Sequence, residues 1–370
     1  MLPRVVHVRK SRLFVALLIF AVFTVSFIFS FLQKSDLYHR STISPRTQQD
    51  ALQNVAFAIN KESFGSATKL PFSTAREDTL PHRTYLISRE RCTQKLFLLI
   101  LVATAPDKID RRNIIRKTWA SDPSMKPRWK TVFLVGQAKD SLQEEHLNAE
   151  SSMYNDLIRG TQKEAYQNLT LKTQMGLEWA AKYCDFQFVM KTDDDCFVNA
   201  YNLMDYLGSP DTPETKLYLG YAARNAKPHR KGKWAVSVKE YNKTTYPQFC
   251  FGVGYVLSAD LVLKMVQLFD AKKPLRLEDV YIGTLVERLG VTDVRHHKGF
   301  RGWEYGRCKY FSDTIVYHQA SISCMEQLFN LAMKERLEGE LKKSKSMKTE
   351  ENKQLLMPVK HNATGQTERV

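Results

Sequence analysis

Three adjacent acidic side chains are the first feature of this sequence that could do chemistry. Asp193, Asp194 and Asp195 follow an apolar run, residues 186–190, that is typical of a short buried strand. Three like charges repel one another, and a bound divalent cation would turn that repulsion into attraction. Ligands of open α/β sheets bind at the carboxyl ends of strands, where these acids fall. The pattern predicts a site for a metal ion and a diphosphate; a solvated acidic turn is the alternative.

Two later positions could complete such a site. Glu278 and Asp279 stand at the start of a predicted helix, residues 280–289. Asp279 could be a helix N-cap, or a general base that the fold holds near the first three acids. His318 lies in the mostly apolar run 314–319, where it could be a core or surface histidine or a third metal ligand.

The elements that must position these residues alternate between strand and helix. Strands are predicted at residues 96–102, 131–136 and 186–190, with helices at 109–119, 140–151 and 169–183 between them. This alternation is typical of a doubly wound, mostly parallel sheet. Helix 109–119 is basic and follows a tight turn, so it could seat a phosphate or be a solvated face. Cys92 and Cys184 each precede a strand, and they could form a disulfide if those strands are neighbours.

The charge of the chain points to an anionic partner. Its net charge is +16 and its pI is about 9.4, which suits nucleic acid, a membrane surface or a phosphate-bearing substrate. The basic residues are scattered, and the sequence has no zinc-finger spacing, no aromatic RNA-binding signature and no basic zipper. We therefore expect no nucleic-acid partner.

The N-terminal region predicts the compartment. Residues 13–32 are uncharged and mostly apolar, and as a helix they would span about 30 Å, the thickness of a bilayer core. Basic residues at positions 4, 9, 10 and 12 place residues 1–12 in the cytoplasm by the positive-inside rule. An uncleaved signal anchor fits this run better than a cleaved signal peptide, whose apolar core is shorter. Residues 33–91 are predicted to be a stem, 92–335 a lumenal domain and 336–370 a disordered polar tail.

Sequons and cysteines agree with a lumenal domain. The sequons at Asn168, Asn242 and Asn362 predict N-glycans. The six cysteines form an even set that an oxidising compartment could pair, and none has the Cys-x-x-Cys spacing of a zinc site.

Five ordered motifs carry a resemblance to a known family. They occupy residues 112–119, 166–173, 191–199, 246–256 and 278–283. With them the chain resembles the β-1,3-galactosyltransferases and the related β-1,3-N-acetylglucosaminyltransferases over roughly residues 92–330. The resemblance implies a GT-A fold, with a Rossmann-like sheet covered by helices on both faces. It also implies a Golgi membrane enzyme with one N-terminal transmembrane helix, which uses Mn²⁺ and transfers a sugar from UDP with inversion.

The resemblance also implies roles for individual residues. Asp195 would be a metal ligand, with His318 as the late histidine ligand, and Asp279 would be the catalytic base. Asp193 would hold the ribose or uracil side of UDP. The remaining predicted nucleotide-binding positions are Asp194, Arg112, Arg116 and Lys172. Family cysteine positions imply a Cys250–Cys308 disulfide. The chain departs from the family pattern at Glu164 (usually Asp), at Cys196 (usually aliphatic) and at Cys324 (additional).

Three functions remain open at this point. The first is transfer of galactose from UDP-galactose, in β-1,3 linkage, to a glycan on glycoprotein or glycolipid, and the form of residues 277–283 favours it. The second is the same transfer of N-acetylglucosamine from its UDP-sugar. The third is a Golgi carbohydrate-binding protein without turnover, against which the intact acids at Asp195 and Asp279 argue. The acceptor is expected to be chosen by loops such as residues 224–245, where a single sequence offers no code.

Overall fold

The computed structural model describes residues 86–88, 90–120, 122, 124, 127–270, 272–302 and 307–355. The predicted membrane anchor, residues 13–32, and nearly all of the predicted stem lie outside this part of the chain. Within it, no helix is both long enough and apolar enough to cross a bilayer.

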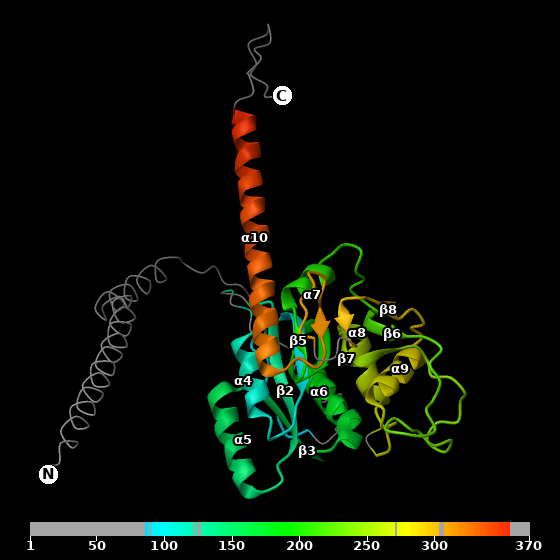
Figure 1. Ribbon diagram of the computed structural model, residues 1–370. Helices are drawn as coiled ribbons and strands as arrows, with labels where there is room; N and C mark the ends of the chain where they lie inside the picture. The colour runs from blue at the N-terminus through cyan, green and yellow to red at the C-terminus, as the bar shows by residue number, and fades with distance from the viewer. Residues whose placement is uncertain are drawn as a thin grey trace, which may run out of the picture. The chain divides into compact units, whose positions relative to one another are not determined.

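A seven-stranded sheet forms the centre of the domain, in the order β3-β2-β1-β4-β7-β6-β8 (Figure 1). The first four strands in that order are parallel, and β7 is antiparallel to both of its neighbours. The strands are β1 Leu96–Ala103, β2 Trp129–Gln137, β3 Leu157–Lys163, β4 Phe186–Asp193, β6 Tyr218–Ala223, β7 Phe249–Ser258 and β8 Arg295–His296.

Helices cover both faces of this sheet, as predicted. Alternate residues of β1 enter different apolar clusters: Leu98 and Ile100 pack with α4, α7 and α10, and Leu99 and Leu101 pack with α6, α8 and α9. A strand buried on both faces reads as a continuous apolar run, which is why β1 was found from sequence. The helices are α4 Ile109–Lys117, α5 Ser141–Tyr154, η1 Tyr166–Asn168, α6 Leu169–Tyr183, α7 Ala200–Leu207, α8 Ala259–Met265, η2 Val266–Leu268, α9 Glu278–Arg288 and α10 Ile322–Leu355.

A second, three-stranded sheet holds the turn after β4. It has the order β5-β10-β9, formed by Phe197–Val198, Val316–Tyr317 and Phe300–Arg301. β5 directly follows the acidic turn, and β10 directly precedes His318. The antiparallel pairing of Tyr317 with Phe197 therefore brings His318 to the acids from a distant part of the chain.

The disulfides confirm one prediction and correct another. Cys92 and Cys184 are bonded, because each precedes one of two neighbouring parallel strands, β1 and β4. The predicted Cys250–Cys308 pair is wrong: Cys308 is bonded to Cys324, sixteen residues further along the chain. Cys250 is a buried free thiol on β7. Cys250 lies beside Gly220 of β6. A Cβ added at Gly220 would stand 2.8 Å from the Cβ of Cys250.

The last helix differs from the predicted disorder after residue 335. α10 continues to Leu355 through a stretch rich in Lys, Glu and Leu, which are good helix formers. Its first turns are held by the buried side chains of Met325 and Leu328 and by the Cys324 disulfide. The Arg336–Glu340 pair, at 3.1 Å, adds a small local contribution. The predicted lumenal domain therefore ends in a helix that runs past its expected boundary.

Candidate functional site

The acidic turn lies at the carboxyl end of β4, next to the end of β1. Ala103 is the register partner of Asp193, and the amide of Asp194 donates to the Ala103 carbonyl at 3.1 Å. The hydroxyl of Thr104 donates to Asp194 Oδ2 at 2.7 Å. Burial raises the pKa of Asp194, and the Thr104 hydrogen bond opposes that effect. Asp194 therefore joins the acidic turn to the loop after β1.

Asp195 and His318 face each other. Their nearest atoms, Asp195 Oδ2 and His318 Nε2, are 3.6 Å apart, which is too long for a hydrogen bond. His318 Nδ1 lies 3.3 Å from the Gly302 carbonyl, which can only accept, so this contact favours the tautomer with the proton on Nδ1. Nε2 then presents its lone pair toward Asp195. A carboxylate and an imidazole side by side, the latter oriented by a carbonyl, are a donor set that suits a divalent cation.

The protein supplies few donors to such a cation. Among the described residues, no group of three or more His, Cys, Asp or Glu side chains is arranged to hold a metal ion. Asp195 and His318 are both partly exposed, at 36% and 20% of their side-chain surface. Cations that bind phosphates through one or two protein ligands complete their coordination with water and with the phosphates themselves. The donor set fits a cation that arrives with a diphosphate.

Lys191 connects the acidic turn to the second acidic site, and sequence reasoning gave it no role. Its buried Nζ lies 2.8 Å from Asp193 Oδ1, 3.0 Å from the Gly252 carbonyl and 3.4 Å from Glu278 Oε2. Burial alone would lower the pKa of Lys191, but the charges of Asp193 and Glu278 raise it above its ordinary value. The ammonium therefore stays charged between the two groups of acids. A single lysine between the apolar run of β4 and the three acids was the available signal.

Asp279 lies in the first turn of α9, after the N-cap residue Leu277, so it is not itself the N-cap. The amide of Gly252 donates to its Oδ2 at 3.3 Å, and the amide of Val280 lies 2.9 Å from its Oδ1. Burial and the neighbouring Glu278 raise the pKa of Asp279 to about 6. A carboxylate with that pKa is well matched to a general base at neutral pH.

Gly252 joins Asp279 to the acidic turn through its own peptide groups. Its carbonyl accepts from Lys191, and its amide donates to Asp279. Asp193 and Asp279 thus stand on opposite sides of one short chain of hydrogen bonds. Glu278 completes the link, since it accepts from Tyr255 at 2.5 Å and faces Lys191. The fold therefore brings the first and second acidic sites together, as predicted.

Two of the predicted basic residues support the loop after β1. Arg112 is fully buried, and its five hydrogen bonds, to Glu150, Thr104, Ala105 and Pro106, use the five donors that a guanidinium has. Lys172 donates to the Thr104 carbonyl at 2.6 Å. These contacts fix the loop whose Thr104 hydroxyl holds Asp194. They leave Arg112 no hydrogen-bond donor to offer a phosphate.

Arg116 is engaged elsewhere. Its guanidinium pairs with Asp156 at 2.8 Å and with Glu150 at 2.7 Å, and it does not contact the acidic turn. Glu164, which departs from the family pattern, pairs with Lys172 at 2.6 Å and accepts from the Gly136 amide. Although Glu164 is longer than the Asp usual in the family, it still forms an ion pair with Lys172.

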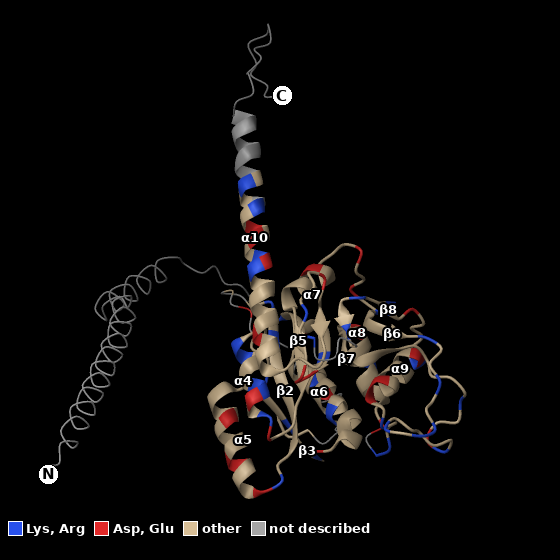
Figure 2. Ribbon diagram, in the orientation of Figure 1, with Lys and Arg blue, Asp and Glu red and all other residues tan. Residues whose placement is uncertain are grey.

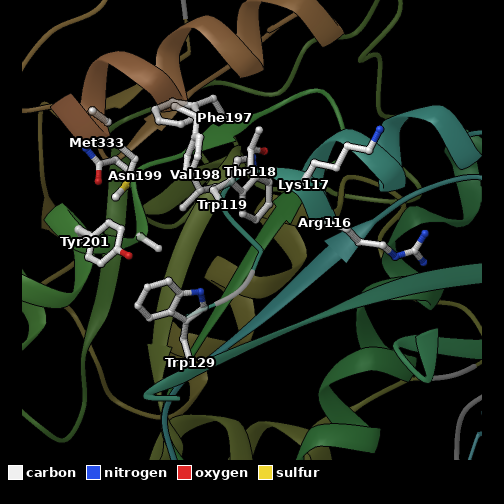
Figure 3. Close-up of a pocket in the computed structure, with 13 residues that line it drawn as sticks. Arg116, Lys117, Thr118, Trp119, Trp129, Phe197, Val198, Asn199, Tyr201 and Met333 are labelled. Atoms are coloured by element: carbon white, nitrogen blue, oxygen red, sulfur yellow. The ribbon is translucent and has the colours of Figure 1, made fainter. Parts of the chain in front are cut away.

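An apolar cavity of about 240 Å³ is lined in part by Phe197, Val198 and Asn199, which follow the acidic turn in sequence. Figure 3 shows its walls, which include Trp119, Trp129, Phe197 and Met333 of α10. None of the acidic side chains described above lines it. Its walls suit apolar groups, so we do not assign a nucleotide to it.

The chain is similar to known proteins over most of its length. The family model described as galactosyltransferase matches residues 110–297. The β-1,3-galactosyltransferase 1 of Homo sapiens is 35% identical over 309 residues, which are 80% of this chain and 92% of that protein. The β-1,3-galactosyltransferase 2 of Homo sapiens is 37% identical over 264 residues, 67% of this chain and 62% of that protein.

Solved structures give only slight likenesses. The galactosyltransferase LgtC, in complex with donor and acceptor sugar analogues, covers 64% of this chain and 95% of its own, with a TM-score of 0.35 and 10% identity. The mannosyltransferase PcManGT of Pyrobaculum calidifontis, with GDP-Man and Mn²⁺, covers 64% of each chain, with a TM-score of 0.33 and 12% identity. Likenesses of this degree support no conclusion about this chain.

Proposed function

Because this chain belongs to the galactosyltransferase family and is a hexosyltransferase, we propose that it transfers galactose from UDP-galactose, in β-1,3 linkage, to a glycan on glycoprotein or glycolipid. The observation that carries the proposal is the placement of Asp279. Asp279 has a pKa of about 6, and Lys191 and Gly252 connect it to the acidic turn, which is suited to a metal ion and a diphosphate. That arrangement provides a base on one side of the site and leaving-group stabilisation on the other.

The reaction follows from these roles as a single displacement. Asp279 accepts the proton of the acceptor's 3-hydroxyl as that oxygen attacks the anomeric carbon of galactose. The bond from the anomeric carbon to the diphosphate oxygen breaks at the same time, and UDP leaves with the electron pair. One displacement converts the α-linked donor into a β-linked product. General-base assistance typically contributes about 10²–10⁴-fold to such a rate.

Asp195 and His318 are the residues that would hold Mn²⁺, which when bound neutralises the charge that develops on the leaving diphosphate. Asp193, which Lys191 orients, is proposed to face the ribose or uracil. Asp194 and the loop held by Arg112 and Lys172 form the wall behind the nucleotide. In this proposal, Arg112 and Lys172 act by positioning the loop.

The location proposed is the Golgi membrane, with residues 13–32 as the anchor and the catalytic domain in the lumen. Asn242 is an exposed sequon residue, which suits an N-glycan. The side chains of Asn168 and Thr170 donate to the carbonyls of Lys163 and Leu275, so that sequon is held within the fold. A glycan at Asn168 would have to be attached before folding; Asn362 lies outside the described residues. Loss of mass on treatment with a peptide N-glycosidase tests all three.

The experiment that tests the function is a donor comparison. The lumenal part, expressed in a secretory host, is incubated with Mn²⁺, an N-acetylglucosamine glycoside and either UDP-galactose or UDP-N-acetylglucosamine. A galactosylated product from UDP-galactose supports the proposal. Transfer of N-acetylglucosamine alone, with a galactoside as acceptor, would assign the other branch of the resemblance. UDP release without a glycosylated product under any condition would contradict transfer.

A further inference from the structure

Two large aromatic side chains lie half exposed and close together near the predicted catalytic base. Tyr166, in η1, is 53% exposed, and Trp234, in the loop formed by residues 224–245, is 51% exposed. The ammonium of Lys233 lies 5.3 Å from the centre of the Tyr166 ring and 5.6 Å from that of Trp234. Cation–π contacts explain how these rings are held together, and about half of each side chain remains exposed to solvent.

The loop that carries Trp234 is well ordered by its own contacts. Arg230 donates to the carbonyls of Val236, at 2.8 Å, and Tyr241, at 3.0 Å. Val236, in the middle of the loop, is buried, with 1% of its surface exposed. Near the two ends of the loop, the amide of Tyr246 donates to the Ala226 carbonyl at 2.8 Å. A loop with this internal structure presents Trp234 at a fixed position, which lowers the entropy cost of binding a ligand there.

Both segments adjoin the start of α9, where Asp279 lies. Ala226 and Tyr241 of the loop pack into one apolar cluster with Val280, the residue after Asp279. The same cluster contains Tyr246 and Phe249. From the other side, η1 runs directly into α6, whose Thr170 hydroxyl donates to the Leu275 carbonyl at 2.8 Å, just before α9.

Electrostatics agree with this placement. Desolvation raises the pKa of the Tyr166 hydroxyl, a hydrogen bond from Trp234 opposes that shift, and the negative charges of Asp279 and Asp193 raise the pKa further. Tyr166 is therefore within electrostatic range of both acids. Figure 2 shows Lys and Arg along the same loop, which offers further donors for hydroxyl groups.

We propose that Tyr166, Lys233 and Trp234 form the acceptor subsite, with the Trp234 ring stacked on the apolar C–H face of the acceptor sugar whose hydroxyl faces Asp279. Lys233 donates hydrogen bonds to hydroxyls at the edge of that sugar. The occupant is a pyranose of the acceptor, because the donor's diphosphate would be anchored at Asp195 and His318, next to β5 and β10 of the three-stranded sheet. This inference rests on the proposed function, since it takes Asp279 to be the base.

The test compares Trp234→Ala and Trp234→Phe with Val238→Ala, a control at an exposed position of the same loop. With UDP-galactose and benzyl N-acetylglucosaminide, Trp234→Ala should raise the acceptor KM about tenfold or more, while the donor KM and the slow release of UDP without acceptor stay within about twofold. Trp234→Phe should keep most of the acceptor affinity because it keeps a ring. Val238→Ala should behave as the wild type. An unchanged acceptor KM in Trp234→Ala would overturn the subsite.

A binding measurement separates this inference from the proposed function. Saturation-transfer NMR of the benzyl glycoside with wild-type protein should show the strongest transfer on the C–H groups of one ring face, and Trp234→Ala should abolish that pattern. If wild-type protein transfers no sugar from either UDP-sugar, the proposed function fails, whatever the NMR shows. If wild-type protein transfers sugar but the NMR pattern survives in Trp234→Ala, only the subsite fails.

Discussion

Replacing Asp279 by Asn should remove turnover and yet stabilise the fold. Asn keeps the size of the side chain and one acceptor oxygen, but it cannot take a proton from the acceptor hydroxyl. A loss of about 10²–10⁴-fold in kcat corresponds to about 3–5 kcal/mol of transition-state stabilisation. Binding of UDP with Mn²⁺ should be unchanged, because the proposed nucleotide contacts are made by other residues.

The stability gain follows from the raised pKa. Burial and Glu278 raise the pKa of Asp279 from 3.8 to about 6, so the folded state binds this proton more tightly than the unfolded state does. The free energy of unfolding therefore falls as pH rises from about 4 to about 6, by roughly 3 kcal/mol for this group. Asn does not ionise, so the variant does not lose this free energy of unfolding above pH 6. Loss of the hydrogen bond from the Gly252 amide offsets about 1 kcal/mol, which leaves a gain of about 1–2 kcal/mol.

The assay combines kinetics with thermal unfolding at pH 7.5. Wild-type kcat/KM should rise with pH through about 6, as Asp279 becomes ionised, and the residual activity of Asp279→Asn should lack that limb. The variant should melt a few degrees higher than the wild type. Asp205→Asn, at a side chain that is 68% exposed, is the matched control and should change neither quantity. Turnover near that of the wild type in Asp279→Asn would refute the reasoning.

Three further outcomes are expected. His318→Ala should weaken Mn²⁺-dependent UDP binding about tenfold or more, measured by calorimetry, and unchanged binding would remove this histidine from the metal site. Lys191→Met should lower the free energy of unfolding by about 3–5 kcal/mol, measured by chemical denaturation, because Glu278 would then be buried without its counter-charge; a loss below about 1 kcal/mol would contradict this account of the lysine. Peptide mapping of the non-reduced protein should recover Cys308 and Cys324 in one linked pair, and recovery of either as a free thiol would exclude that disulfide.

The features that were predictable from the sequence are those that local patterns specify. The apolar run of β1 and the periodicity of α6 gave those elements their observed positions, and the step from an apolar strand to three acids placed the acidic turn at the carboxyl end of β4. Cys92 and Cys184 followed because two neighbouring parallel strands begin beside them. In each case the signal lies within a few residues of the feature.

The features that could not be predicted depend on partners far along the chain. Nothing near Arg112 indicates that Glu150 will occupy its guanidinium, so its role changes from a phosphate ligand to a support of the loop. Lys191 looks like an ordinary polar residue in a strand until β7 and α9 pack against it. β3 was missed because only its first two residues, Leu157 and Ile158, are apolar, and the rest of this edge strand has no apolar pattern.

The most direct test of the central claim is the stereochemistry of the product. The lumenal protein is incubated with UDP-galactose, Mn²⁺ and benzyl N-acetylglucosaminide, and proton NMR follows the new anomeric signal as it forms. The proposed single displacement with Asp279 as base predicts a β-linked galactose on the 3-oxygen as the first product. An α-linked galactose, or accumulation of free galactose and UDP with the acceptor unchanged, would contradict it.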